Sequence, residues 1–167
     1  MAILDILTYP HPLLKKPCVA LSEGEICSPD IQQLIADMTE TMYANTGAVG
    51  LAAAQVGRSV RMVVMDATAK TTRDRLFVLI NPDITAQSQW KFSREGCLSF
   101  PDYLVTVKRA RKITLNWLDP QGNRQEDQFR DFEAIIAQHE TDHLDGILFL
   151  DRIKNIQTDL IYRLPSS

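Results

Sequence analysis

The chain has 167 residues, of which 45% are hydrophobic and 23% are charged, and its formal net charge is -3. A length of this order suits one folded domain, residues 1–167, that is large enough to bury a core without disulfide staples. The acidic balance, with a pI of about 5.6, argues against a nucleic-acid groove as the main binding surface, so no direct nucleic-acid binding is expected.

The chain start and the cysteines indicate the compartment. Residues 1–7 lack the basic start and apolar stretch of a signal peptide, and no apolar run approaches the roughly 20 residues that span a bilayer. Cys18, Cys27 and Cys97 are odd in number and irregularly spaced, which argues against a disulfide framework. We therefore expect a cytoplasmic protein that does not contact a membrane.

The first predicted elements are a turn-rich arm and a helix. Prolines at positions 10, 12 and 17 restrict the backbone of the arm. The helix is predicted to follow Ser28, whose side chain can cap free backbone N–H groups, and Pro29 suits the first helical position. Its apolar residues repeat at helical spacing: Ile31, Leu34, Ile35, Met38 and Met42.

The middle of the chain is predicted to form strands. Val60–Met65 and Leu76–Ile80 are rich in β-branched and aliphatic residues, the second ending at Asn81-Pro82, and 113–118 alternates as a half-buried strand does. The basic run 108–112 is interpreted as the solvated end of a strand. A second helix, capped by Asp131 and ending before Gly146, completes an α+β fold.

The most informative segment is 138–143, which has the pattern His-Glu-x-x-His. His139 and His143 are four residues apart, so on a helix both side chains can point at a common ion. Glu140 lies about 100° around the helix, close enough to touch a metal-bound water without being a ligand. Both histidines fall on a helix face that is expected to be buried, together with Phe132, Ile135 and Ile136. Burial of two imidazoles is costly unless each finds a partner, which favours a metal-dependent hydrolase over simple packing. The remaining histidine, His11, is interpreted as structural.

The third metal ligand is not fixed by this helix. The extended metalloprotease pattern would place it at Phe149, which cannot bind metal, and no glutamate follows Glu140. Cys97 is a soft donor suited to zinc or ferrous iron, although taken alone it is more simply explained as a small buried hydrophobe. Three downstream carboxylates remain formally possible: Asp145, Asp151 and Asp159.

A third segment of interest is the small-residue run that ends in Gln55. The amide of Gln55 can donate a hydrogen bond to a developing oxyanion, although an alanine run is by itself more typical of helix or close packing.

Taken together, three segments resemble the signature motifs of peptide deformylases in order and approximate spacing: Gly50–Gln55, Glu95–Ser99 and Gln138–His143. The resemblance extends over most of the chain, including the proline-rich arm. It implies a single catalytic domain of antiparallel or mixed β-sheets packed around a central metal-binding helix. It also implies an N-formylmethionyl peptide substrate, release of formate, and one divalent metal ion, natively Fe²⁺, with Zn²⁺ or Ni²⁺ also accepted.

The resemblance assigns a role to each matched residue. The ligands would be Cys97, His139 and His143, with water or hydroxide in the fourth position. Glu140 would take a proton during attack on the formyl carbon and pass it to the departing amine. The side chain of Gln55 and the backbone N–H of Leu98 would stabilise the oxyanion.

The resemblance also predicts the substrate contacts. The substrate backbone would pair like an added strand with the segments that contain Val49, Gly50, Glu95 and Gly96. The methionine pocket would be lined by Phe132, Ile135 and Ile136.

Three departures from the family pattern bear on these expectations. Ala48 stands at a position where many members have glycine, so a positive φ there would strain the backbone by roughly 1 kcal/mol unless the loop is reshaped. Leu104 replaces an arginine that bacterial members often carry, so selection of the second substrate residue is expected to differ. The chain after His143 is short, so a long basic C-terminal helix that contacts the ribosome is expected to be absent or stunted, and ribosome attachment is doubtful.

Two alternatives stay open from the sequence. One is another metallo-amidase or metallopeptidase, which Phe149 and the missing downstream glutamate disfavour. The other is a paralogue that binds metal or formyl-peptide with little turnover.

Overall fold

The structure is a computed structural model that describes residues 2–163. No helix among these residues has the length and apolar character needed to cross a membrane. The helices are α1 (Glu23–Ile26), α2 (Pro29–Ala44), α3 (Asp131–Leu144) and α4 (Ile156–Asp159), with short 3-10 turns η1 (Pro12–Lys15), η2 (Ala53–Val56) and η3 (Phe149–Arg152). The strands are β1 (Gly50–Ala52), β2 (Met62–Asp66), β3 (Leu76–Cys97), β4 (Phe100–Leu118), β5 (Arg124–Arg130) and β6 (Leu160–Tyr162).

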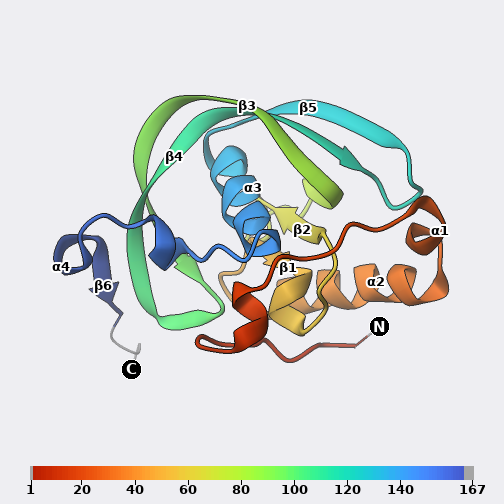
Figure 1. Ribbon diagram of the computed structural model, residues 1–167, viewed down its shortest axis with the longest axis horizontal. Coiled ribbons are helices and arrows are strands. Elements are labelled where there is room, and N and C mark those ends of the chain that lie inside the picture. The colour runs from red at the N-terminus through yellow and green to blue at the C-terminus, as the bar shows by residue number, and fades with distance from the viewer. Residues whose placement is uncertain (1, 164–167) are drawn as a thin grey trace.

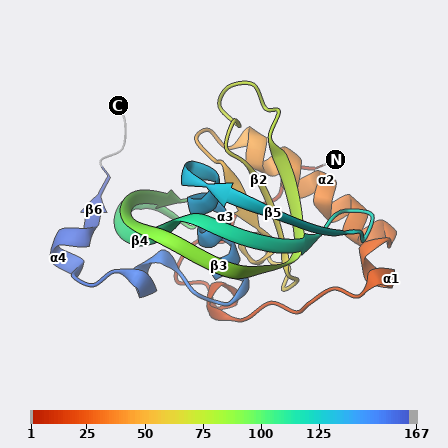
Figure 2. The ribbon, with the colours of Figure 1, turned by 90° about the horizontal axis from the view of Figure 1, so that it is seen from above.

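The six strands form one antiparallel sheet in the order β1-β2-β3-β4-β5, and β6 pairs with the first part of β4. The pairing of β3 with β4 shifts register at three places, and such bulges bend a strand pair and increase its twist. The two long strands arch over α3, as Figure 1 shows, and Figure 2 shows them crossing above the helix. This confirms the predicted α+β fold around a central helix.

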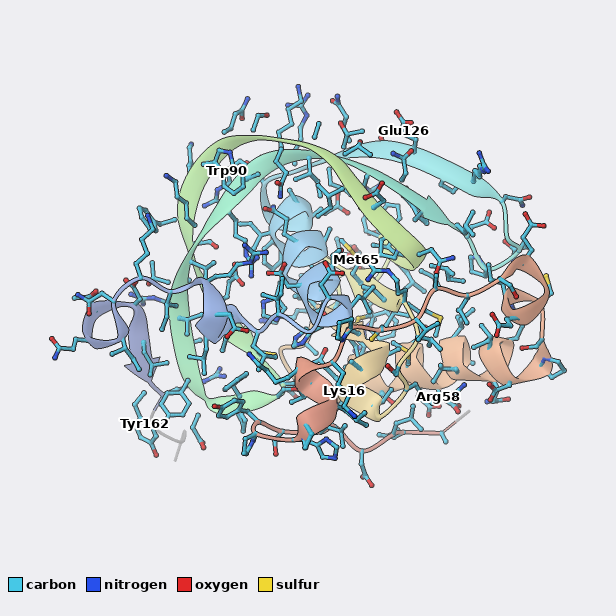
Figure 3. All side chains as sticks on the ribbon, viewed as in Figure 1. Lys16, Arg58, Met65, Trp90, Glu126 and Tyr162 are labelled. Carbon is cyan, nitrogen blue, oxygen red and sulfur yellow. The ribbon has the colours of Figure 1, made fainter. Side chains whose placement is uncertain are left out.

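The strand β2 lies between the two long helices and is buried along its whole length. Because side chains alternate across a strand, Val63 and Met65 pack into the cluster that contains α3. Met62 and Val64 pack into the cluster that contains α2. Met65, labelled in Figure 3, lies at the centre of the molecule. The sheet therefore holds α3 in a fixed place, while β1 ends the sheet order with one edge not paired to another strand among the described residues.

The start of α2 agrees with the prediction. The Ser28 hydroxyl accepts a hydrogen bond from the N–H of Ile31, and Pro29 is the first residue of the helix. The predicted apolar face is the one that packs, with Met38 and Met42 fully buried.

The bounds of three predicted strands are wrong. The strand that begins at Leu76 does not end at Asn81-Pro82, because the ladder resumes at Asp83 after a register shift and continues to Cys97. Asn81 adopts a positive φ of 49°, and its N–H bonds to the carbonyl of Arg61, so the break becomes a bulge. The strand predicted at 113–118 is the end of β4, which begins at Phe100, and the strand predicted at 60–65 is β2, shifted to 62–66.

The strand β5 was not predicted, because its sequence is almost entirely polar. Phe129 is its one buried residue, and the other six are exposed at the edge of the sheet. Its neighbour α3 begins at Asp131, as predicted to within one residue, but Arg130 takes the cap position and no side chain caps the helix. The Asp131 cap is therefore a wrong prediction.

The basic run 108–112 is only partly solvated. Arg109 is 2% exposed, although Lys108 beside it faces solvent. The prediction of a solvated strand end fails at Arg109 because its guanidinium has buried carboxylate partners on β3 and α3.

The predicted helix stop at Gly146 is confirmed, and it generates a test of stability. Gly146 has a φ of 71°, and a Cβ at this position would lie 2.6 Å from the carbonyl oxygen of Lys15. We expect Gly146→Ala to lower the free energy of unfolding by about 2 kcal/mol or more. Alanine is strained in the left-handed backbone conformation, and its methyl group would overlap with the backbone of Lys15. Urea unfolding measures this change. Gly24→Ala is the control, because Gly24 has open space around it and is expected to stay near wild type or gain slightly. Equal stability of the two variants would contradict the role of Gly146.

Candidate metal centre and active site

Three side chains that could hold a metal ion converge between the end of β3 and α3. The sulfur of Cys97 and the ring nitrogens of His139 and His143 all lie within 4.8 Å of one another. Cys97 Sγ is 3.4 Å from His143 Nε2. One sulfur and two imidazole nitrogens suit a divalent zinc, iron or nickel ion, and all three residues are buried.

The downstream carboxylates that the sequence left open are engaged elsewhere. Asp145 pairs with Arg61 at 2.7 Å, and Asp151 pairs with Lys15 at 2.9 Å. Asp159 accepts hydrogen bonds from two backbone N–H groups next to α4. Phe149 is buried and packs its ring edge-on against His139, with 5.7 Å between ring centres. Cys97 is therefore the third donor that the fold brings to the histidine pair.

A buried carboxylate orients the first histidine. Glu95 Oε1 lies 2.8 Å from His139 Nδ1, so a proton on Nδ1 leaves Nε2 free as a metal donor. Burial alone would raise the pKa of Glu95, but hydrogen bonds from His139 and Arg109 lower this pKa to about 2. Glu95 is therefore an anion that fixes the orientation of His139.

Arg109 connects the carboxylate of Glu95 to α3, the helix that carries both histidines. Its guanidinium donates to both oxygens of Glu95, at 2.9 and 3.0 Å, and to Asp142 at 2.6 Å. Asp142 also accepts two hydrogen bonds from Arg152. The roles of Arg109 and Asp142 were not predicted from the sequence. Asp142 could have indicated such a network, because it lies between His139 and His143 on a helix that is expected to be buried. A buried carboxylate is costly unless a cation pairs with it.

The general acid/base candidate, Glu140, is buried at the edge of the same site. Its Oε1 lies 3.9 Å from His139 Nε2, and its Oε2 has no hydrogen-bond partner among the described residues. Burial raises the pKa of Glu140 to about 7, and the neighbouring charge of Glu95 acts in the same direction. A carboxyl group in this state can take a proton and return it.

The backbone of Gly50 forms the wall against Glu140. A Cβ on Gly50 would lie 2.8 Å from Glu140 Cγ and 3.0 Å from Ile136 Cγ2. Position 50 therefore needs glycine because the side chains of Glu140 and Ile136 pack directly against its backbone. A turn is not the reason, since the φ of Gly50 is not positive.

The amide of Gln55 is held in one orientation. Its Oε1 accepts a hydrogen bond from the N–H of Ala52, so its NH₂ group faces the opposite way. That NH₂ group donates to Ser99 Oγ at 3.1 Å and lies 3.6 Å from Cys97 Sγ. The hydroxyl of Ser99, for which the sequence predicted no role, donates in turn to the carbonyl of Leu7.

A cleft of about 800 Å³ runs past these groups. It is bordered by every residue for which a substrate contact was predicted: Val49, Gly50, Glu95, Gly96, Phe132, Ile135 and Ile136. Gln55 and Leu98 also border it, as do Cys97, His139 and Glu140. Phe132 is 51% exposed, so the prediction that it lies on the buried stripe is wrong, whereas Ile135 and Ile136 are buried. Phe132 stands at the rim of the cleft.

The loop before β1 takes its positive φ at Gly47 and not at Ala48. Gly47 takes a φ of 89°, while Ala48 keeps an ordinary negative φ and is buried. The strain considered for Ala48 is therefore avoided, because the neighbouring glycine supplies the turn.

Comparison with known proteins identifies the family. Residues 3–159 match the model of the polypeptide deformylase family. The chain belongs to this family. The peptide deformylase of Desulfotalea psychrophila is 41% identical over 161 residues, covering 96% of this chain and 93% of that protein. The enzyme of Syntrophobacter fumaroxidans is 42% identical over 163 residues, covering 98% of this chain and 94% of that protein.

Solved deformylase structures share the fold. The Legionella pneumophila peptide deformylase superposes with a TM-score of 0.86 at 36% identity, covering 93% of this chain and 89% of that one. The class I type b peptide deformylase of Acinetobacter baumannii in its Met-Ala-Ser-bound form gives a TM-score of 0.83 at 34% identity, covering 90% of this chain and 98% of that one. Peptide deformylases are metal-dependent enzymes, in agreement with the converging donors described above.

The close approach at Gly50 gives a test of the site. We expect Gly50→Ala to push Glu140 out of position and to lower kcat by about a hundredfold, since a misplacement near 1 Å has that effect on catalytic groups. Bound metal, measured by elemental analysis, should be unchanged, because the three atoms nearest to the added methyl group belong to Glu140 and Ile136 and not to the metal donors. Gly24→Ala again serves as control, and wild-type kcat in Gly50→Ala would rule out this geometry.

Proposed function

We propose that the protein removes the formyl group from the N-terminal formylmethionine of newly made peptides and releases formate. The observation that carries this proposal is the buried carboxyl of Glu140, whose Oε2 has no partner among the described residues, beside three converging metal donors in a cleft of about 800 Å³. The activity of the family, and the Met-Ala-Ser complex of a relative, support a peptide substrate.

We propose Cys97, His139 and His143 as the ligands of one divalent ion. The donor set suits Fe²⁺, which we propose as the native ion, and it also suits Zn²⁺ and Ni²⁺. When bound, such an ion supplies Lewis acidity that polarises the formyl carbonyl and makes water easier to deprotonate. The thiolate donor would make an iron form sensitive to oxidation at Cys97.

The roles of the protein groups follow from their positions. Glu140 takes a proton from the attacking water and returns it to the amine that leaves. The NH₂ group of Gln55 and the backbone N–H of Leu98 stabilise the oxyanion. The fixed orientation of Gln55 supports this role, because a preorganised donor of this kind is worth about 10²–10³ in turnover.

The substrate is proposed to bind as an extended strand. Val49 and Gly50, at the start of β1, and Glu95 and Gly96, at the end of β3, all border the cleft, so backbone groups of two separate segments are available for pairing. Glu95 contributes through its backbone, since its side chain is engaged by His139 and Arg109. The methionine side chain enters the apolar wall formed by Phe132, Ile135 and Ile136, where it gains mainly from buried area.

We propose a cytoplasmic location, because Cys97 must stay reduced to bind metal and all three cysteines are free thiols. We propose no more than a transient contact with the ribosome. The helix after the metal site, α4, has four residues and is followed by β6, so the described part of the C-terminus offers no long basic helix.

Replacement of the proton carrier tests the proposed reaction. We expect Glu140→Gln to reduce formate release from formyl-Met-Ala-Ser by at least about a hundredfold, the usual contribution of a positioned acid/base group, with metal content unchanged. Glu133→Gln is the matched control, because Glu133 lies on the same helix but pairs with Arg75 away from the metal, and it should keep wild-type turnover.

The same assay separates the alternatives. Full activity of Glu140→Gln would refute the mechanism. Cleavage of internal peptide bonds would indicate a peptidase. If the metal-loaded wild type binds formyl-peptide but releases no formate, the protein is a paralogue of low turnover.

Replacement of the sulfur donor tests the metal site. Protein purified without oxygen should contain about one ion per chain, and Cys97→Ala should contain far less, because two histidines alone hold a divalent ion weakly. Cys27→Ala is the control, since Cys27 is exposed at the end of α1. Stoichiometric metal in Cys97→Ala would mean that the third donor lies elsewhere.

A further inference from the structure

The last strand of the described chain ends at the mouth of the cleft. β6 pairs with β4 in the register Tyr103↔Tyr162, Leu104↔Ile161 and Val105↔Leu160. The rings of Tyr103 and Tyr162 meet edge to face at 5.6 Å, and the N–H of Arg163 donates to the carbonyl of Asp102 at 2.6 Å. Figure 3 labels Tyr162, which marks this end of β6. The backbone of Arg163 is therefore held, although its side chain is exposed.

The guanidinium of Arg163 lies over the strand that carries Cys97. Its Nη2 donates to the carbonyl of Pro101 at 3.3 Å and is 3.6 Å from the place where a Cβ on Gly96 would be. Arg163 borders the cleft, and it forms no ion pair with a carboxylate of residues 2–163. Leu104, which faces Gly96 across the hairpin, brings no charge of its own.

The charges around the cleft leave its outer part positive. The cations that border it are Lys70, Arg94 and Arg163, and within the described chain none of them is in a salt bridge. Asp102 is the carboxylate at the rim. Glu95 is neutralised by Arg109 and His139, and Glu140 lies inside at the metal donors.

We infer that Arg163 is a specificity-determining residue, which favours formyl-peptides that carry a carboxylate shortly after the formylmethionine. The inference rests on the proposed function. With the methionine side chain against Ile135 and Ile136, positions two to four of an extended substrate cover roughly 10 Å and reach the outer part of the cleft. An exposed guanidinium attracts a carboxylate there without touching the reacting bond, so its effect falls on KM rather than on kcat.

The test compares peptides that differ by one charge. The substrates are formyl-Met-Ala-Glu and formyl-Met-Ala-Gln, both amidated at the C-terminus, and formyl-Met-Ala-Gln with a free C-terminus. Wild type should show a kcat/KM about twofold to fivefold higher for the Glu peptide than for the amidated Gln peptide, the range of an exposed ion pair. The third peptide shows whether a terminal carboxylate is recognised as well as a side chain.

Variants assign the preference to one residue. Arg163→Gln should abolish it through a rise in KM for the Glu peptide, whereas Arg163→Lys should keep most of it. Arg124→Gln removes the same charge from β5, outside the cleft, and should keep the full preference. The melting temperature of Arg163→Gln should match wild type, because the pairing of β6 is made by backbone groups and Tyr162.

The outcomes are distinct from failure of the proposed function. If formate is not released from the neutral amidated peptide, deformylation itself is refuted. If wild type hydrolyses the Glu and Gln peptides equally well, or if Arg163→Gln keeps the preference, the role of Arg163 is overturned.

Discussion

The active site depends on one buried guanidinium. Arg109 reaches from the middle of β4 to Glu95 on β3 and to Asp142 on α3, so it ties the hairpin that carries Cys97 to the helix that carries both histidines. Loss of one partner from such a buried network usually costs about 3–5 kcal/mol, because the other charges stay buried without compensation. Ion pairs among side chains that are not metal donors thus hold the strand that carries the sulfur next to the helix that carries the imidazoles.

The same network explains why two buried carboxylates in one site behave differently. Glu95 receives hydrogen bonds from Arg109 and His139, and its pKa is held at about 2. Glu140 has no such donors, and burial lifts its pKa to about 7. Environments that separate two pKa values in this way divide the roles, one group for charge and orientation and the other for proton transfer.

The sequence predicted the features that depend on local spacing. The Ser28 cap, the Gly146 stop and the His139–His143 pair each require only neighbours along the chain, and the structure confirms their placement. The errors arose where distant segments decide the outcome. β5 could not be recognised because its polar residues face solvent and its pairing with β4 defines it, and Arg109 looked solvated because its partners are 14 and 33 residues away. The exposure of Phe132 likewise reflects the open cleft, which helical periodicity does not show.

Within residues 2–163, one edge of β1 is not paired to another strand, and this edge bears on when the substrate can bind. An open strand edge accepts a partner only as extended backbone, since a helix or a compact turn cannot present its N–H and carbonyl groups in that register. With Gly50 directly against Glu140, a substrate that pairs with this edge brings its first amide bond to the proton carrier. Under the proposed binding mode, the edge would select chains that have not yet folded. An N-terminus already packed into its own protein could not pair in this way, so the reaction would have to precede folding.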